Sequence, residues 1–225
     1  MTRIVHSYSS LKQFEQCPKQ FHEVRVLKRY KQEDTDATRY GTAVHKAIED
    51  YIMLGTPFPT EFAKFQPVVD QVLAKTKGER TCEAKLGLDD LGHTRDFFAE
   101  DAFLRGVPDL MVVNEPKKVA YIVDWKTGKS SKYADPEQLE LMAVIAMCHN
   151  LAIETVRCAL VFLVANDIVT ADYNRGQLPA LLAKWHRRGY DVQKLVDAGG
   201  PWNARPNSLC RFCPVTSCPH HPNSE

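Results

Sequence analysis

The amino-acid sequence predicts an α/β fold in which a mixed central sheet is flanked by helices. The chain has 225 residues, which is enough for one domain with a substantial hydrophobic core. Hydrophobic residues make up 44% and charged residues 25%, as in an ordinary globular protein. Helical and strand patterns alternate along the sequence, and such an order packs most readily as a sheet with helices on its faces.

Three helices are predicted in the first third of the chain, because apolar residues recur there at helical spacing. We expect Ser9 or Ser10 to cap the first helix, since a serine side chain accepts a hydrogen bond from a free backbone amide at that position. The second helix is predicted over residues 41–54 and the third over residues 62–74.

A strand-rich region follows these helices. Two of its segments, 106–113 and 119–125, are separated by a turn at 114–116 and predict a hairpin. The apolar run over 156–164 is typical of a buried strand. The remaining expected strands are residues 81–86, 93–98 and 168–173.

Two further helices are predicted, over residues 136–149 and 178–198. Pro136 suits the first turn of a helix, because its missing amide hydrogen would have no partner there. The tail over residues 202–225 is rich in Pro, Asn and Cys and shows no periodicity. It is expected to hold a defined shape only if something cross-links it.

Composition and charge bear on location and partners. No run of about 18 apolar residues occurs, so no membrane-spanning helix is expected. Residues 1–10 lack the apolar segment of a signal peptide, which predicts a cytoplasmic protein, or one of the host cytoplasm if a phage encodes it. The net charge of +1 does not itself predict nucleic-acid binding. Basic residues would have to gather at 25–31 or 126–132, and the alternative is that both stretches are solvated loops.

Acidic and basic side chains meet on the predicted hairpin. Asp124 and Lys126 are two residues apart on a strand, so their side chains share one face. The preceding strand carries Asp109, which the pairing can bring next to Asp124. Two carboxylates at close range repel each other, and Mg²⁺ or Mn²⁺ would relieve that repulsion. The hairpin therefore predicts a divalent-cation site.

Such a set of groups suits phosphodiester hydrolysis, which needs a cation to polarise the phosphate and to activate water. Lys126 can stabilise the negative charge that develops. His45 can add a nitrogen ligand, which favours Mn²⁺ somewhat over Mg²⁺. Glu49 shares a helix face with His45 and could fix the imidazole or hold a water at the metal. Each piece alone has a plainer interpretation, a surface salt bridge or a packed histidine, but the combination indicates catalysis.

In these residues the chain resembles the RecB-like branch of the PD-(D/E)XK nuclease superfamily, over nearly its whole length. The shared motifs are Gly-x-x-x-His ending at His45, Gly-x-x-Asp ending at Asp109, Asp-x-Lys-Thr-Gly over 124–128, and a helix led by Gln138. The resemblance implies a restriction-endonuclease-like core, with metal held by the histidine and both acids. It also implies a catalytic Lys126 and contact of Gln138 with DNA. The family often has Tyr where this chain has Met142, which weakens the expected DNA contact.

The implied function is that of a metal-dependent deoxyribonuclease. It would be an exonuclease that hydrolyses single-stranded or end-exposed DNA in recombination, repair or phage DNA metabolism. Residues 1–225 would form one nuclease domain with its catalytic core at 41–175. Besides DNA, the expected partner is a second copy of the chain or a recombination or replication protein. The alternative is a non-catalytic DNA-binding module with the same fold, although such a module would be free to lose Lys126.

Seven cysteines are present, and an odd number argues against a disulfide framework. Cys82, Cys148 and Cys158 stand singly among apolar residues and are expected to be buried small hydrophobes.

Cys210, Cys213 and Cys218 lie close together in the aperiodic tail and predict a bound metal. Zinc and an iron–sulfur cluster are both candidates, and both usually take four ligands. The fourth ligand is either local, at the histidine pair 220–221, or distant, at Cys17.

The resemblance extends to these cysteines. CRISPR-associated small exonucleases and AddB-type nuclease domains carry one cysteine before the histidine motif and three near the C-terminus, and the four hold a [4Fe–4S] cluster. The resemblance therefore implies that Cys17 and the three tail cysteines hold such a cluster, with structural Zn²⁺ as the alternative. The cluster would join residues 1–30 to residues 202–221. The last cysteine spacing departs slightly from the family, which more often has five intervening residues than four.

Overall fold

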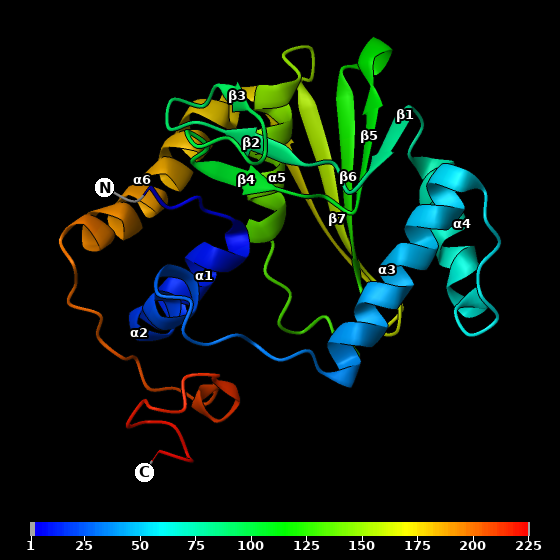
Figure 1. The fold of residues 1–225 in the computed structure, drawn as a ribbon. Helices are drawn as coiled ribbons and strands as arrows, with labels where there is room; N and C mark the ends of the chain where they lie inside the picture. Colours follow the sequence, from blue (N-terminus) through cyan, green and yellow to red (C-terminus); the bar gives the residue numbers. More distant parts are fainter. Residues whose placement is uncertain (1–2, 225) are drawn as a thin grey trace.

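A mixed sheet forms the centre of the computed structural model, which describes residues 3–224 (Figure 1). Strand order in this five-stranded sheet is β1-β5-β6-β7-β8. The β6 and β7 strands run parallel, whereas the other neighbouring pairs run antiparallel. Their bounds are β1 Glu79–Cys82, β5 Leu110–Asn114, β6 Val119–Lys126, β7 Thr155–Phe162 and β8 Asp167–Asn174. The predicted α/β class is confirmed. The predicted domain spans residues 1–225, and both of its end residues lie outside the described part of the chain.

The predicted hairpin is confirmed as β5 and β6, which pair antiparallel around a short 3₁₀ turn, Glu115–Lys117. The prediction of one strand over residues 106–113 is wrong in one respect, because two separate strands occupy this region. Its first part belongs to β4 (Leu104–Gly106) and the rest to β5, with a link that contains Pro108. Proline has no amide hydrogen to donate to a strand partner, so the ladder breaks there.

A second, three-stranded sheet has the order β3-β2-β4 and contains β2 (Leu86–Leu88) and β3 (Thr94–Arg95). The predicted strands 81–86 and 93–98 are therefore misplaced and too long. Glu83 adopts a positive φ of 52°, which ends β1 before β2 begins. The Asp89 carboxylate accepts hydrogen bonds from the Leu91 and His93 amides and folds the turn between β2 and β3.

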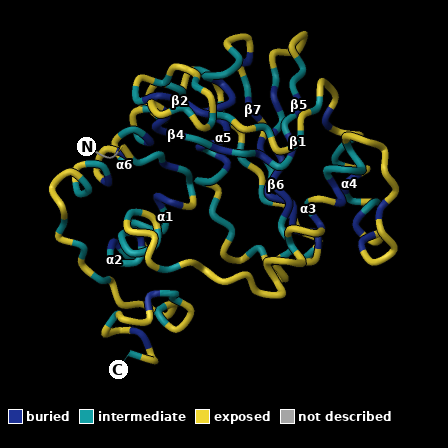
Figure 2. The backbone as a smooth tube through the Cα atoms, in the orientation of Figure 1, coloured by how far each residue is buried: buried dark blue, intermediate teal, exposed yellow. Residues whose placement is uncertain are grey.

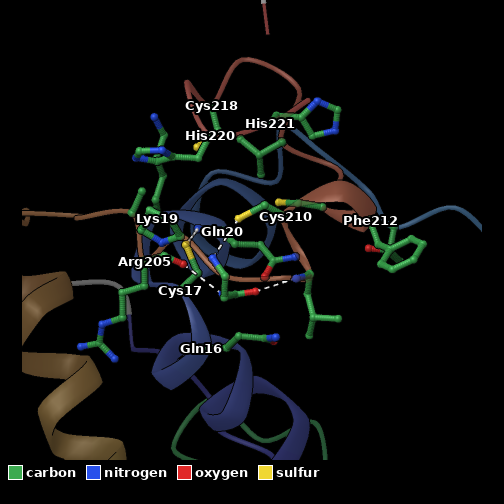
Figure 3. A pocket seen from close by; sticks show the side chains of 17 residues that line it. Gln16, Cys17, Lys19, Gln20, Arg205, Cys210, Phe212, Cys218, His220 and His221 are labelled. Carbon is green, nitrogen blue, oxygen red and sulfur yellow. Dashed lines mark hydrogen bonds between the residues drawn. The ribbon is translucent and has the colours of Figure 1, made fainter. Parts of the chain in front are cut away.

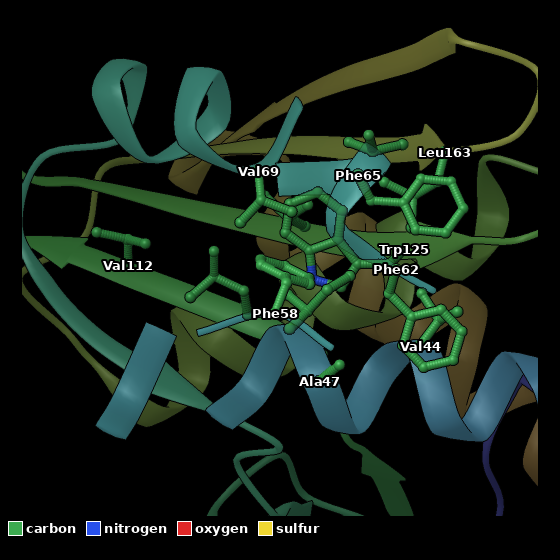
Figure 4. Packing of buried hydrophobic residues seen from close by; sticks show 13 residues of the cluster. Val44, Ala47, Phe58, Phe62, Phe65, Val69, Val112, Trp125 and Leu163 are labelled. Atoms are coloured by element: carbon green, nitrogen blue, oxygen red, sulfur yellow. The ribbon is translucent and has the colours of Figure 1, made fainter. Parts of the chain in front are cut away.

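Helices α3 (Asp36–Leu54) and α4 (Gln66–Lys75) cover one face of the large sheet (Figure 1). Phenylalanine side chains and Trp125 of β6 fill the space between these helices and the sheet (Figure 4). Helix α3 begins earlier than the predicted residue 41, because Thr35 caps it in a reciprocal pair with Thr38. Helix α4 likewise begins at Gln66 rather than at residue 62, after a 3₁₀ turn over Ala63–Phe65.

Helix α5 (Glu137–His149) covers the other face of the sheet. Its far side packs against α6 (Leu178–Asp197), α1 (Tyr8–Gln16) and the small sheet, so it is apolar on every side. Figure 2 shows buried residues along α5 and the neighbouring strands. Helix α1 is capped by Ser7 rather than by Ser9 or Ser10: the Ser10 amide donates to Ser7 Oγ, and the Ser7 amide donates to Ser10 Oγ.

The first and last segments of the chain lie beside each other (Figure 1). Helix α2 (Pro18–Phe21) and a π-helical turn, His22–Val26, face a tail whose one short element is a 3₁₀ turn, Cys210–Phe212. The Tyr30 hydroxyl lies 2.8 Å from Ser217 Oγ and helps hold the tail in place. Within residues 3–224, the helices are too short or too polar to cross a membrane.

Candidate active site and cysteine cluster

The hairpin brings two carboxylates together at one end of the sheet. Leu110 pairs with Val123, so Asp109, the residue before β5, lies opposite Asp124 of β6. The Trp125 amide donates a hydrogen bond to Asp109 Oδ2 over 2.6 Å. Backbone register therefore fixes the position of Asp109 at the mouth of the hairpin.

His45 reaches the same point from α3. Its Nδ1 lies 3.3 Å from Asp109 Oδ1. Burial acts to lower the pKa of His45, but the hydrogen bond and charge of Asp109 outweigh it, so the pKa is raised overall. Asp109 thus binds a backbone amide through one oxygen and an imidazole through the other.

Glu83 is a third acid at this point, and sequence reasoning missed it. Ligand atoms of His45, Glu83 and Asp109 all lie within 4.8 Å of one another, close enough to hold one metal ion. The Glu83 amide donates to the Asp109 carbonyl over 3.3 Å, which fixes the end of β1 beside the hairpin. Burial, followed by the charge of Asp109, raises the pKa of Glu83. Its signal in the sequence is weak, a single acid after a short strand.

Asp124, Lys126 and Gln138 form a closed network on the α5 side of the sheet. Lys126 Nζ lies 2.5 Å from Asp124 Oδ1 and donates to Gln138 Oε1 over 3.1 Å. The Gln138 amide group in turn donates to Asp124 Oδ2. Burial and the nearby charge of Asp109 raise the pKa of Asp124 from 3.8 to about 6, although Lys126 opposes this shift. Gln138, in the first turn of α5, thus orients both groups.

Glu49 and Met142 lie apart from this network. The Glu49 carboxylate pairs with Lys46 Nζ at 3.1 Å. Met142 is only 7% exposed, and a Cβ added at Gly106 would lie 2.5 Å from its sulfur. Met142 is therefore a core residue beneath the link from β4 to β5. Among the predicted site residues, His45 contacts Asp109, and Asp124 contacts Lys126 and Gln138. Among the described residues, the group of ligand atoms within 4.8 Å of one another contains His45 and Asp109 but not Asp124.

A family model described as the PD-(D/E)XK nuclease superfamily matches residues 5–219. The chain belongs to this superfamily. Its fold is similar to that of a protein from Eubacterium rectale provisionally named an exonuclease, with a TM-score of 0.55 and 11% identity over 93% of this chain and 86% of that one. The crystal structure of SSO0001 is also similar, with a TM-score of 0.49 and 17% identity over 96% and 86% of the two chains. No curated protein matches.

The nuclease has a second cluster of side chains of metal-ligating types where its two ends meet. Cys17, Cys210, Cys213 and Cys218 line one cavity of about 230 Å³, and Figure 3 shows three of them around the same space. The Gln20 amide donates to Cys17 Sγ at 3.5 Å, and the Asn207 amide donates to Cys210 Sγ at 3.4 Å.

The metal-ligating atoms around this cavity do not form a compact group among the described residues. Among the described residues, no three sulfur or imidazole nitrogen atoms around it lie within 4.8 Å of one another. Burial raises the pKa of Cys213, a backbone hydrogen bond at Val215 lowers it, and the charges of the other three thiols raise it further. The two histidines of the tail also line the cavity.

The other cysteines of the nuclease lie elsewhere. Cys158 is buried, as predicted, whereas Cys82 and Cys148 are only half-buried at the edges of the core. Burial raises the pKa of Cys82 to about 12 and that of Cys148 to about 11, so both thiols stay protonated and unreactive at neutral pH.

Proposed function

We propose that this chain is a Mg²⁺- or Mn²⁺-dependent deoxyribonuclease of the RecB-like branch. It would act as an exonuclease on single-stranded or end-exposed DNA, in recombination, repair or phage DNA metabolism. One observation carries the proposal: an imidazole, three carboxylates and an ammonium group converge at one end of the β5–β6 hairpin. Membership of the superfamily supports it, as does the provisional name of the Eubacterium rectale protein.

His45, Asp109 and Asp124 would hold the cation, with Glu83 as a further ligand. The fit rests on the chemistry of these donors, because clustered carboxylates resist ionisation until a cation neutralises them. Burial, followed by the charge of Asp109, raises the pKa of both Asp124 and Glu83. When bound, the cation would polarise the phosphate and lower the pKa of a water molecule.

The remaining groups act on the substrate. Lys126 places its ammonium group beside Asp124, where it would stabilise the negative charge that develops on the phosphate. Gln138 holds Lys126 and Asp124 in their relative positions and would contact DNA at the start of α5. In this proposal residues 1–225 form one nuclease domain, with the catalytic core over 41–175.

Substitution of Lys126 tests the nuclease proposal. Lys126→Ala should lower the rate of Mn²⁺-dependent cleavage of end-labelled DNA by about 10²- to 10³-fold, since it removes a group that acts in the transition state. Lys117→Ala, at the far end of the same hairpin, changes the same charge on an exposed side chain and should cleave at the wild-type rate. Equal cleavage by wild type and Lys126→Ala would refute the assignment. Binding of DNA without any cleavage by wild type would favour the non-catalytic module.

For the cysteine cavity we propose a [4Fe–4S] cluster held by Cys17, Cys210, Cys213 and Cys218. A tetrahedral zinc site with Zn–S bonds near 2.3 Å needs its sulfurs roughly 3.8 Å apart, and among the described residues no three ligand atoms of this cavity lie within 4.8 Å of one another. The cavity of about 230 Å³ also exceeds what a single ion would fill. Amide donors to sulfur, as at Cys17 and Cys210, suit thiolates that ligate a cluster.

Anaerobic purification tests the cluster. The wild-type protein should be brown and contain iron and sulfide, whereas Cys17→Ala should lose both. Cys148→Ala, which alters a thiol outside the cavity, should keep them. A colourless wild-type protein that contains zinc would overturn this assignment and favour the structural Zn²⁺ alternative.

A further inference from the structure

A large groove runs along the N-terminal helices, separate from the metal-binding side chains. It encloses about 1400 Å³, which is larger than a typical small-molecule site. Its walls are α1, the π-helical turn with the segment up to Gln32, and a few residues from β4 and the end of α6. Its size alone suggests a polymer rather than a metabolite.

The lining of the groove is strongly basic, although the whole chain carries a net charge of only +1. Of the acids within residues 3–224, Asp197 is the one that lines it. Two of the basic residues are neutralised from outside the groove, Arg3 by Asp90 and Lys12 by Asp135. The basic residues that form no ion pair within residues 3–224 are Arg25, Lys28, Lys31 and Arg105.

The other lining residues suit a nucleic-acid strand. Serine and glutamine side chains along α1 can donate hydrogen bonds to phosphate oxygens. Tyr8 and Tyr30 contribute aromatic rings, on which unpaired bases can stack. A positive groove with interspersed aromatic rings is the arrangement that single-strand binders use.

Two walls of the groove lead directly to the candidate active site. Arg105 comes four residues before Asp109, so the backbone separates them by at most about 14 Å. On the other wall, Lys12 pairs at 2.9 Å with Asp135, which lies just before α5 and its Gln138. At a rise of about 3.4 Å for each stacked nucleotide, the groove lies within roughly four nucleotides of the site.

We propose that this groove holds the non-reacting part of a single-stranded polynucleotide while a phosphate of the same strand occupies the active site. The inference rests on the proposed nuclease function and adds to it the substrate form and the binding surface. A duplex keeps its bases stacked inside, so it would leave the two tyrosine rings unused. The four unpaired cations should each release a counterion, so log K should fall with log salt concentration with a slope of about −3 for a single strand.

A pair of charge-matched double variants tests the groove. Lys28→Gln with Lys31→Gln removes two of its cations, and Lys75→Gln with Lys77→Gln removes two exposed lysines at the end of α4. Binding of a fluorescent oligodeoxythymidylate is measured by anisotropy in EDTA at several salt concentrations. The groove variant should bind roughly 10-fold more weakly, with a salt slope reduced by about 1.4, and the control variant should bind as wild type does.

Two further measurements separate this proposal from the nuclease proposal. Hydrolysis of bis(p-nitrophenyl) phosphate, which is too small to need the groove, should be equal in the groove variant and wild type. A wild-type protein that binds the oligonucleotide but hydrolyses neither substrate would refute the nuclease and leave the groove standing. Equal oligonucleotide binding by the two double variants, or tighter binding of a hairpin duplex than of the single strand, would overturn the groove proposal.

Discussion

Asp109 and Asp124 lie opposite each other, but their surroundings stabilise a negatively charged carboxylate to different extents. Asp109 receives hydrogen bonds from the Trp125 amide and from His45. Asp124 is almost fully buried, and its pKa is raised to about 6 despite its contact with Lys126. Without a cation, Asp124 is therefore the carboxylate whose charge is more costly to the fold.

This difference predicts a pH dependence of stability. Because the pKa of Asp124 is raised on folding, its contribution is most favourable below the unfolded value of 3.8 and is lost as pH rises towards about 6. In EDTA, thermal melts of wild type should show this decline between about pH 4 and pH 6, and Asp124→Asn should not. Added Mn²⁺ should raise the melting temperature of wild type more at pH 7.5 than at pH 5, since ligands bind metal when deprotonated. Identical pH profiles for the two proteins would contradict this account.

A second prediction at this scale separates two acids close to His45. Glu83 lies within ligand distance of His45 and Asp109, whereas Glu49 pairs with Lys46. Glu83→Gln should therefore weaken Mn²⁺ binding by roughly 10-fold or more, as expected when a group at a metal site is lost. Glu49→Gln should change the Mn²⁺ affinity less than about threefold. Isothermal titration of both variants measures this, and the reverse order of effects would assign the metal site to Glu49.

At the scale of elements, two helical glycines differ in the space around them. A Cβ at Gly189 of α6 would lie 2.7 Å from the Phe103 ring and 2.9 Å from the His6 ring. At Gly41 of α3 the nearest atom is 3.4 Å away, which is ordinary contact. Helix α6 thus approaches the small sheet more closely than a side chain would allow.

The two glycines should respond to alanine in opposite ways. Gly41→Ala should raise the free energy of unfolding by about 0.5–1 kcal/mol, because alanine loses less backbone entropy in a helix. Gly189→Ala should lower it by about 1–3 kcal/mol, because two rigid rings must move. Urea denaturation measures both changes. A stabilising Gly189→Ala would show that α6 and Phe103 can separate at little cost.

The elements that could be predicted are those with a clear period. The β5–β6 hairpin and α5 follow from alternation and from long apolar runs, and the register of the hairpin places Asp109 opposite Asp124. Element ends were less predictable, because they depend on single polar contacts such as the Thr35–Thr38 cap of α3. The break at Pro108 separates two strands that share one apolar pattern.

The candidate site was predictable only where its residues share a strand or a local motif. Glu83 joins it through the pairing of β1 with β5, a contact between segments distant in sequence, and no local pattern marks it. The basic stretch 25–31 was a candidate from the sequence and supplies three of the four unpaired cations of the groove, whereas Arg105 joins them from a distant segment and could not be predicted. Net charge obscures the groove, since acids elsewhere balance those cations.

At the scale of the whole molecule, the two ends meet around the cysteine cavity, and the tail has almost no buried core of its own. Val215 is the one apolar residue of the described tail, residues 202–224, that is fully buried. The central elements, from α3 to β8, are held instead by large apolar clusters on both faces of the sheet.

Loss of the proposed iron–sulfur cluster should therefore loosen the ends first. After chelation or oxidation, limited proteolysis should cut within residues 202–224 and residues 27–35 well before it cuts the central elements. Mass spectrometry of the fragments would locate the cuts, and the anaerobic metal-loaded protein serves as the reference. Cleavage of the central elements at the same rate as the tail would show that the ends are not a separate unit of stability.

The cysteine cavity and the basic groove share a wall, which is formed by Gln16, Gln20 and Gln32. In the proposed arrangement, oxidation of the thiols would disturb the groove before it disturbs the hydrolytic residues. Loss of the proposed cluster would then weaken retention of the strand while hydrolysis itself persists. In that state the proposed exonuclease would remove only a few nucleotides at each encounter instead of digesting a strand to completion.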